Sequence, residues 1–468
     1  MLFNTLQFAV FFAAVLAGYR LLPVRWRNAW LLAASLAFYS LWIPVYLLLL
    51  LVDASINYAL LRAMARSRRP SLLLGASIGG TLGVLAFYKY GAFFALSIAP
   101  LTRSLLGFSP PAVDILLPLG ISFYSFQIVG LSIDVYRGQI EVPRSFWRYL
   151  LFVSFFPQLI AGPILRGREF LPQLARGGEF SADRTRRGLW LIASGLTKKV
   201  ILGDFLLAPL VNQVYTNPGI SSAPVHLIAT YSFAFQIYFD FSGYTDMARG
   251  MACLLGFDLP NNFMEPYLAR NPAEFWRRWH MTLSRWLRDY LYIPLGGNRG
   301  GAGRSYLNLM LTMLLGGLWH GAGWNFVVWG GLHGLLLALH RRFSGRRGGA
   351  EREFRPIDVV QVFFHFHAVC LLWIFFRAAT LGDAFTVLER LFTGSYAGAW
   401  PVLPGLVVVA CFGLQVVERW ARLALPRARE ALGYGGIGRA VEAAALGVVA
   451  ALTILASGTG AEFIYFQF

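Results

Sequence analysis

The chain has 468 residues, of which 57% are hydrophobic and only 14% charged, and its mean hydropathy is +0.56. This composition excludes a soluble globular protein, because apolar runs long enough to cross a bilayer recur from end to end. The formal net charge is +18, but the basic residues gather in short loops between apolar runs, so membrane lipid is the expected partner and nucleic acid is not. The chain has three cysteines, Cys253, Cys370 and Cys411, and they show no CxxC spacing. The absence of this spacing argues against a disulfide framework and a zinc cluster.

The apolar runs predict an all-α polytopic membrane protein without a soluble domain or a convincing internal repeat. The first run has neither a basic leading region nor a small-residue cleavage site, so we expect a retained span and not a removed signal. Residues 91–110 are expected to lie at the membrane interface. Spans are expected over residues 2–19, 28–43, 44–61, 71–88, 113–136, 188–208, 226–257, 305–320, 322–340, 357–377, 402–418 and 440–458.

A further apolar run, at residues 154–167, is interrupted by Pro157, Gly162 and Pro163. Broken backbone at membrane depth is tolerated only where protein or a water-filled cavity covers it, so we interpret this run as re-entrant. An even number of spans then separates each major basic loop from the next, and all of these loops can face the cytoplasm. This topology places both termini outside and residues 261–304 on the cytoplasmic side.

An Arg- and Trp-rich segment precedes the most informative spans. Asn271 is a predicted N-cap, Pro272 fits the first helical position, and Glu274 sits where a capping-box partner belongs. One face of the predicted helix is apolar and its other face is basic, which is typical of a helix lying in the membrane interface. His280 lies at the edge of the apolar face. The apolar face holds Phe275, Trp276, Trp279, Leu283, Trp286, Leu287 and Tyr290, and the opposite face holds Arg277, Arg278, Arg285, Arg288 and Asp289.

Asn308, Thr312, Gly316 and His320 recur every four residues in the run 305–320 and form a narrow stripe of polar and small residues. Such a stripe lines a passage or packs tightly against a neighbouring helix. A lone histidine in a helix bundle is often a hydrogen-bonded core residue, but an ionisable side chain at membrane depth is a functional candidate by default. The glycines on both sides in LWHGAGWNF favour room for a substrate, and neutral imidazole is the usual general base for a hydroxyl.

Other ionisable residues have both a functional and a structural interpretation. Asp240 and Asp246, in YFDFSGYTDMARG, line a cytoplasmic vestibule or form hydrogen bonds inside the bundle. Arg277 and Arg278 are candidates for binding the phosphates of a coenzyme or of lipid head groups. No metal site is expected. His226, His333 and His340 are expected to be structural. His365 and His367 are two residues apart, so they face different sides of a helix and are not expected to form a metal site.

The string EFWRRWHMTLSRWLRDYLYIPLGGNR, followed by LLGGLWHGAGWNFVVWGGLHG, resembles the membrane-bound O-acyltransferase (MBOAT) family, in particular its bacterial branch for alginate O-acetylation. The likeness extends to FDFSGYTDMARG, LPNNFMEPYLAR, FPQLIAGPI and PLGISFYSFQ. It is strong over residues 115–340, the acyltransferase core of what is then a single membrane domain over residues 1–468. The resemblance implies an MBOAT-type bundle of about eleven or twelve transmembrane helices, with re-entrant and interfacial helices around a central tunnel.

In the family, the catalytic histidine matches His320 and the second active-site residue matches His280. The resemblance implies an O-acyltransferase of the bacterial inner membrane that takes an acetyl group from cytoplasmic acetyl-CoA or another acyl thioester, without a bound cofactor. The acetyl group would be exported for O-acetylation of an extracellular polysaccharide, with an extracytoplasmic SGNH or esterase-like partner. The sequence shows no clear oxyanion donor, and Asn308, Asn325 or a glycine N–H are the candidates.

The chain ends in the aromatic tail 459–468, which includes FIYFQF and places Tyr465 on the predicted outer side. Terminal motifs of this kind in the family suggest that Tyr465 relays the acyl group to a partner, whereas an aromatic anchor at the membrane interface is the simpler alternative. Two other functions remain open, namely D-alanyl or longer acyl transfer, and a transporter or flippase. A transporter tends to show paired broken segments, and the run 154–167 has no evident twin.

Overall fold

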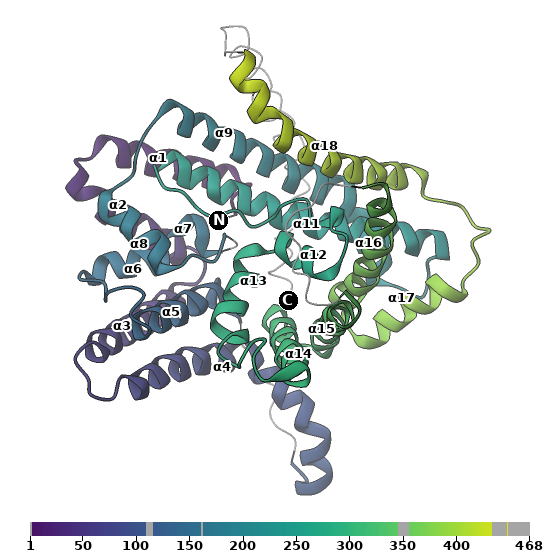
Figure 1. Cartoon of the computed structure of the whole chain (residues 1–468), viewed down its shortest axis with the longest axis horizontal. Helices are drawn as coiled ribbons and strands as arrows, with labels where there is room; N and C mark the ends of the chain where they lie inside the picture. Colours follow the sequence, from purple (N-terminus) through teal and green to yellow (C-terminus); the bar gives the residue numbers. More distant parts are fainter. Residues whose placement is uncertain (1, 109–115, 161, 345–354, 433–446, 448–468) are drawn as a thin grey trace. The chain divides into compact units, whose positions relative to one another are not determined.

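A computed structural model describes residues 2–108, 116–160, 162–344, 355–432 and 447, and within these ranges the regular elements are all helices. The chain, whose helices are labelled in Figure 1, divides into two compact units. The first comprises Met1–Ile192 and Tyr244–Pro260, and the second comprises Ala193–Gly243 and Asn261–Phe468. The chain crosses from one unit to the other at three points, after Ile192, after Gly243 within the long helix α11 (Ala223–Leu254), and after Pro260.

The first unit contains the helices of the N-terminal part of the chain. They are α1 (Leu6–Leu21), α2 (Val24–Ser40), α3 (Pro44–Met64), α4 (Pro70–Leu106), α5 (Ile121–Tyr136), α6 (Phe146–Ser154), α7 (Phe156–Leu159), α8 (Gly167–Arg176) and most of α9 (Ala182–Leu196).

The second unit contains the first part of α11 and the remaining elements. They are η1 (Thr197–Leu207), α10 (Ala208–Thr216), η2 (Pro266–Leu268), α12 (Pro272–Arg278), α13 (Met281–Leu287), η3 (Arg288–Tyr292), α14 (Gly301–His320), α15 (Trp324–Ser344), α16 (Pro356–Arg377), α17 (Leu381–Thr393) and α18 (Val402–Leu432).

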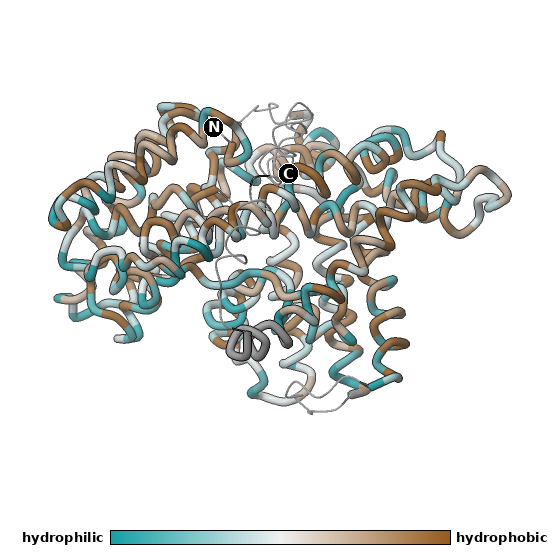
Figure 2. Tube along the Cα trace, turned by 90° about the horizontal axis from the view of Figure 1, so that it is seen from above, coloured by the Kyte–Doolittle hydropathy of each residue, from teal (hydrophilic) through white to brown (hydrophobic). Residues whose placement is uncertain are grey.

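Four of the described helices are long and apolar enough to cross a membrane: α3, α4, α16 and the Val402–Arg422 part of α18. Figure 2 shows brown, hydrophobic stretches recurring along the helices of both units. Helix α4 is continuous over 37 residues, so the prediction of a span at 71–88 followed by a separate interfacial segment at 91–110 was wrong. The helix continues until Gly107, whose φ of 63° ends it. The predicted span at 440–458 falls almost entirely outside the described residues.

The broken run at 154–167 is irregular, as its prolines and glycines predicted. α6 ends at Ser154, the single turn α7 follows, and helix resumes only with α8. This irregular backbone is covered by protein: Pro157 and Gln158 are buried, and the Gln158 Oε1 accepts a hydrogen bond from the Gln127 side chain (2.6 Å). Protein burial is the condition under which broken backbone survives at membrane depth.

Candidate active site

The Arg- and Trp-rich segment is broken at His280. Helix α12 ends at Arg278, His280 has a φ of 41°, and α13 begins at Met281. The break occurs because the backbone on both sides bonds to the stretch before η2. The Met264 N–H donates to the Arg278 carbonyl (3.0 Å), and the Met281 N–H donates to the Asn262 carbonyl (2.9 Å). A continuous helix would use these groups internally, so the prediction of one uninterrupted helix was wrong.

The N-terminus of α12 is capped as predicted, but the charged side chain of Glu274 makes contacts that were not predicted. The Asn271 side chain accepts the Glu274 N–H (2.9 Å) and Pro272 is the first helical residue, as expected. Glu274 does not complete the predicted capping box. Its carboxylate instead accepts from the backbone N–H of Arg270 (3.0 Å) and from the guanidinium of Arg278 (2.7 Å). The polar side chains of α12 therefore tie the segment to its neighbours.

Arg278 is buried and does not lie on an exposed basic face as predicted. It shares Glu274 with Arg270, which in turn contacts Asp358 at the start of α16 (3.3 Å). Burial raises the pKa of Glu274, but the hydrogen bonds of Arg270 and the charge of Arg278 lower it by more. Of the two arginines predicted to bind donor phosphates, Arg278 is occupied by these ion pairs, whereas Arg277 is exposed.

Asn262 contacts the histidine at the break. Its Oδ1 lies 3.2 Å from His280 Nδ1 and accepts hydrogen bonds from the N–H (3.1 Å) and the hydroxyl (3.0 Å) of Thr282. His280 is 0% exposed, and the ring of Phe241 lies edge-on to it with a centroid separation of 4.7 Å. Burial lowers the pKa of His280 from its ordinary value of 6.5 to about 3, so its imidazole is neutral at pH 7.

His320 is the last residue of α14 and lies inside a box of aromatic rings. It is 3% exposed, and its ring centroid is 5.0 Å from that of Trp319, 5.1 Å from Trp329 and 5.4 Å from Phe376. The ring of His280 lies 6.4 Å away. The structure therefore brings together the two histidines that the sequence singled out. The aromatic walls shield the pair from bulk solvent, which strengthens any electrostatic interaction there.

The glycines near His320 serve helix packing. A Cβ on Gly317 would overlap the carbonyl oxygen of Phe326 and lie 3.0 Å from the Gly330 Cα. A Cβ on Gly321 would overlap the Phe326 ring. Helices α14 and α15 thus cross at a distance that only small residues allow (Figure 1). The expectation that these glycines leave room for a substrate was wrong in this conformation, because Phe326 fills that room.

The polar stripe on α14 is buried along its whole length. The Asn308 Nδ2 donates to the Gly297 carbonyl (3.2 Å), and the Thr312 hydroxyl donates to the Asn308 carbonyl (2.7 Å). A Cβ on Gly316 would lie 3.3 Å from a methyl group of Leu287 on α13. The structure thus shows the stripe packed against neighbouring segments, and its role in lining a passage stays a prediction.

The two aspartates of the YFDFSGYTDMARG motif lie in different compact units. Asp240 pairs with Lys199 (2.5 Å), which also contacts Asp204 (2.8 Å), and these three side chains are at most 3% exposed. Lys199 and Asp204 belong to η1, a π-helix, which is a rare form that is frequent at functional sites. Asp246 instead pairs with Arg249 one turn later on α11 (3.3 Å).

Asn325 connects two helices. Its Nδ2 donates to the carbonyl of Ala378 (2.9 Å) and so joins the start of α15 to the end of α16. His333 is buried between Phe275 and Trp329, as expected of a packing residue. Among the described residues no group of three or more His, Cys, Asp or Glu side chains is arranged to hold a metal ion. The tail 459–468 with Tyr465 lies outside the described residues.

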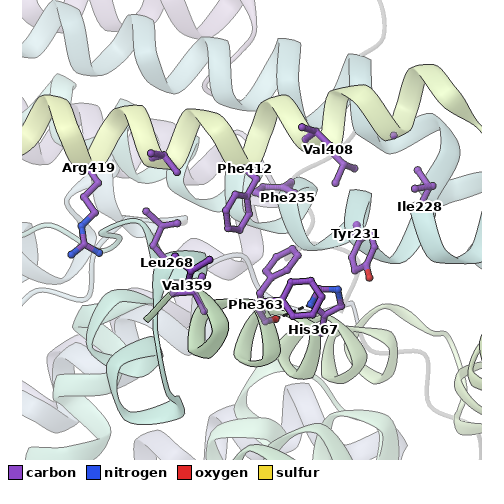
Figure 3. A pocket seen from close by; sticks show the side chains of 15 residues that line it. Ile228, Tyr231, Phe235, Leu268, Val359, Phe363, His367, Val408, Phe412 and Arg419 are labelled. Carbon is purple, nitrogen blue, oxygen red and sulfur yellow. Dashed lines mark hydrogen bonds between the residues drawn. The ribbon is translucent and has the colours of Figure 1, made fainter. Parts of the chain in front are cut away.

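A separate groove of about 740 Å³ lies in the second unit, lined by α11, η2, α16 and α18. Its lining is apolar except for Tyr231, His367 and Arg419, and Figure 3 shows Arg419 at one end and Tyr231 toward the other. The Nδ1–H of His367 is already donated to the Phe363 carbonyl (2.7 Å). The groove does not bring catalytic groups together, so the histidine pair remains the candidate active site.

Sequence reasoning missed Asn262, Thr282 and Lys199. Asn262 stands in the motif LPNNFMEPYLAR, but nothing in the local pattern reveals that its side chain reaches residues 280–282. Lys199 offered a clearer signal, because a lysine inside a predicted span is a functional candidate by default.

Comparison with known proteins agrees with the family resemblance seen in the sequence. The model of the membrane-bound O-acyltransferase family matches residues 80–379, which lie in both compact units. A probable alginate O-acetylase AlgI of Azotobacter vinelandii is 40% identical over 84% of this chain and 78% of its own length. A peptidoglycan O-acetyltransferase of Helicobacter pylori is 37% identical over 84% of this chain and 80% of its own. A teichoic acid D-alanyltransferase of Bacillus subtilis is 29% identical over 54% of this chain and 66% of its own.

Proposed function

This chain belongs to the membrane-bound O-acyltransferase family, and we propose that it moves an acetyl group from a cytoplasmic thioester across the bacterial inner membrane for O-acetylation of an extracellular, alginate-like polysaccharide. The proposal is supported by the relatives named as O-acetylases and O-acetyltransferases, which cover most of the chain. The observation that carries the chemistry is the buried pair of His280 and His320, with ring centroids 6.4 Å apart. The D-alanyl relative covers less of the chain, and D-alanyl transfer is the second candidate.

The catalytic step is a proton-coupled acyl transfer at His320. The neutral imidazole takes the proton of an acceptor hydroxyl while the hydroxyl oxygen attacks the thioester carbonyl. The C–S bond then breaks, the acyl group stays on the oxygen as an ester, and the imidazolium returns its proton to the leaving thiolate. His280 is the second active-site residue. A site closed by aromatic rings also protects the thioester from hydrolysis, because water is excluded.

The donor is acetyl-CoA or another acyl thioester that enters from the cytoplasmic side, and Arg277 is the exposed cation suited to its phosphates. Around this site we infer a bundle of about eleven or twelve transmembrane helices with a central tunnel. The α14 stripe of Asn308 and Thr312 borders that tunnel once the aromatic side chains around His320 have moved aside. Asn325, or a glycine N–H, is the candidate oxyanion donor.

The acceptor hydroxyl of the acyl-transfer step is that of Tyr465, and its acyl ester is then passed on the outer side to an SGNH or esterase-like partner that acetylates the polymer, which restores the tyrosine hydroxyl. Tyr465→Phe removes only the hydroxyl that would carry the acyl group. We therefore expect normal membrane levels of this variant and loss of polymer acetylation. Unchanged acetylation, measured as released acetate per unit of purified polysaccharide, would make the tail an interface anchor.

The central experiment is His320→Ala, with polymer acetylation measured in cells and the amount of protein in the membrane measured in parallel. Loss of general-base catalysis reduces the rate by about 10²–10⁴-fold, so acetylation should fall to background at normal protein levels. His367→Ala is a matched control, because that histidine lies on the apolar groove outside the proposed active site. Near-normal acetylation in His320→Ala would remove His320 from the catalytic role. Transfer of labelled acetate to the polymer, and not of labelled D-alanine, separates the two candidate functions.

A further inference from the structure

Asn262 makes contacts to three consecutive residues at the break between α12 and α13. Its backbone carbonyl accepts the N–H of Met281, and its side-chain oxygen accepts the N–H and hydroxyl of Thr282 and lies 3.2 Å from His280 Nδ1. Asn262 is itself fully buried. One amide side chain therefore determines the local geometry of the second active-site histidine.

The contact to Thr282 identifies which atom of the Asn262 amide faces the histidine. A backbone N–H only donates, so the atom that it meets at 3.1 Å is the amide oxygen and not the NH₂ group. An amide oxygen only accepts, so the hydrogen bond between Asn262 and His280 requires a proton on Nδ1. A neutral imidazole carries one N–H, and the lone pair of His280 is therefore on Nε2.

The lone pair on His280 Nε2 is available to accept a hydrogen bond within the active site. Nε2 is buried and has no hydrogen-bond partner among the described residues. The backbone of His280 is held at a φ of 41°, and Glu265 at a φ of 39° is the other non-glycine residue of the described chain with a positive φ. Such conformations cluster at functional sites, where surrounding contacts impose them. Here those contacts are the hydrogen bonds to Asn262 and the paired backbone around it.

We propose that Asn262 is a positioning residue that holds His280 as its Nδ1–H tautomer, so that Nε2 is a pure hydrogen-bond acceptor which orients the N–H of His320. This inference rests on the proposed function for its catalytic consequence, but the tautomer itself does not. The arrangement follows the logic of hydrolytic triads, in which a third group fixes the tautomer and orientation of the base. Ring centroids 6.4 Å apart leave a gap that a single water oxygen can bridge between the two imidazoles.

The tautomer is tested by ¹⁵N NMR of histidine-labelled, full-length protein in detergent, with His280→Gln used to assign the signal. We expect His280 to show a protonated Nδ1 and an unprotonated Nε2 at pH 7. A protonated Nε2 would overturn the proposal whether or not the protein is an acyltransferase.

The positioning role is tested with two variants of Asn262 and one control. Asn262→Leu should lower kcat at least about tenfold with little change in KM, and should release the preference for the Nδ1–H tautomer. Asn262→Asp keeps an acceptor oxygen and adds a negative charge, so it should retain more activity than Asn262→Leu and shift the acidic limb of the pH–rate profile upward. Gln213→Leu, at an exposed position of α10 outside the proposed active site, should behave as wild type.

Two outcomes would contradict the positioning role. If Asn262→Leu folds and keeps the wild-type kcat and pH profile, Asn262 does not position His280 for catalysis. If Asn262→Leu fails to fold, Asn262→Asp decides, and an unshifted pH profile in that variant overturns the proposal. Loss of activity in His320→Ala together with a wild-type Asn262→Leu would leave the proposed function standing and remove only this inference.

Discussion

The two histidines of the candidate active site are held by different physical means. His280 lies at a break between short helices, where an amide, paired backbone groups and a buried ion cluster impose a left-handed conformation. His320 ends a regular helix, and its ring is fixed by aromatic side chains and by a glycine-mediated helix crossing. One side of the site therefore depends on hydrogen bonds and charges, and the other on shape.

The two sides of the site are therefore expected to be destabilised by different kinds of substitution. Polar support fails when one partner is removed and another is left buried without compensation. Support that depends on close packing fails when a larger side chain is introduced where two helices touch. Three experiments test whether the two sides respond in these two ways.

Arg278→Gln should be the most destabilising, because it removes a cation that is bonded to the buried Glu274 carboxylate. Breaking a buried ion pair in this way costs about 3–5 kcal/mol. The measurement is the thermal unfolding of the purified protein in detergent. Arg277→Gln, at the exposed neighbouring position, should change stability by less than about 0.5 kcal/mol. Equal stability of the two variants would show that charges do not support the His280 side.

Gly330→Ala tests the packing side. The added methyl group would overlap the carbonyl oxygen of Met313, so α14 and α15 must separate. Overpacking of this kind costs about 1–3 kcal/mol, and acetylation should fall with it because His320 moves with α14. Gly413→Ala on α18 is the matched control, since a Cβ there meets nothing within 4 Å. A Gly330→Ala protein as stable and active as the control would rule out the tight crossing.

The pH dependence of stability gives a gradual effect, which is the smallest of the three when it is expressed per pH unit. The pKa of His280 is lowered in the folded state to about 3, so the unfolded chain binds a proton more readily below pH 6.5. The contribution of His280 to stability is complete above about pH 6.5 and is lost as the pH falls toward 3. The slope amounts to about 1.4 kcal/mol per pH unit. Between pH 6 and pH 4, wild type should lose more stability than His280→Gln, and parallel curves would show that His280 is not buried in its neutral form.

Local signals in the sequence predicted several features correctly. The N-cap of α12 follows from Asn271 and Pro272, because capping depends on residues three apart. The irregular backbone near Pro157 follows from residues that cannot continue a helix. The predicted boundary between the span at 71–88 and the segment at 91–110 failed, because α4 is one helix from Pro70 to Leu106. Helix ends were thus predicted correctly where a capping or helix-breaking residue determines them.

The amino-acid sequence was sufficient to identify an all-helical membrane protein of the O-acyltransferase family and to single out both His280 and His320. Composition, apolar run length and contiguous motifs are properties of the chain alone, so no fold was needed to recognise them. The folded structure was needed to show that the helix breaks at His280, that Arg278 is buried, and that Asn262 contacts His280. These features arise from hydrogen bonds and ion pairs between segments far apart in the chain, which outweigh the local helical periodicity.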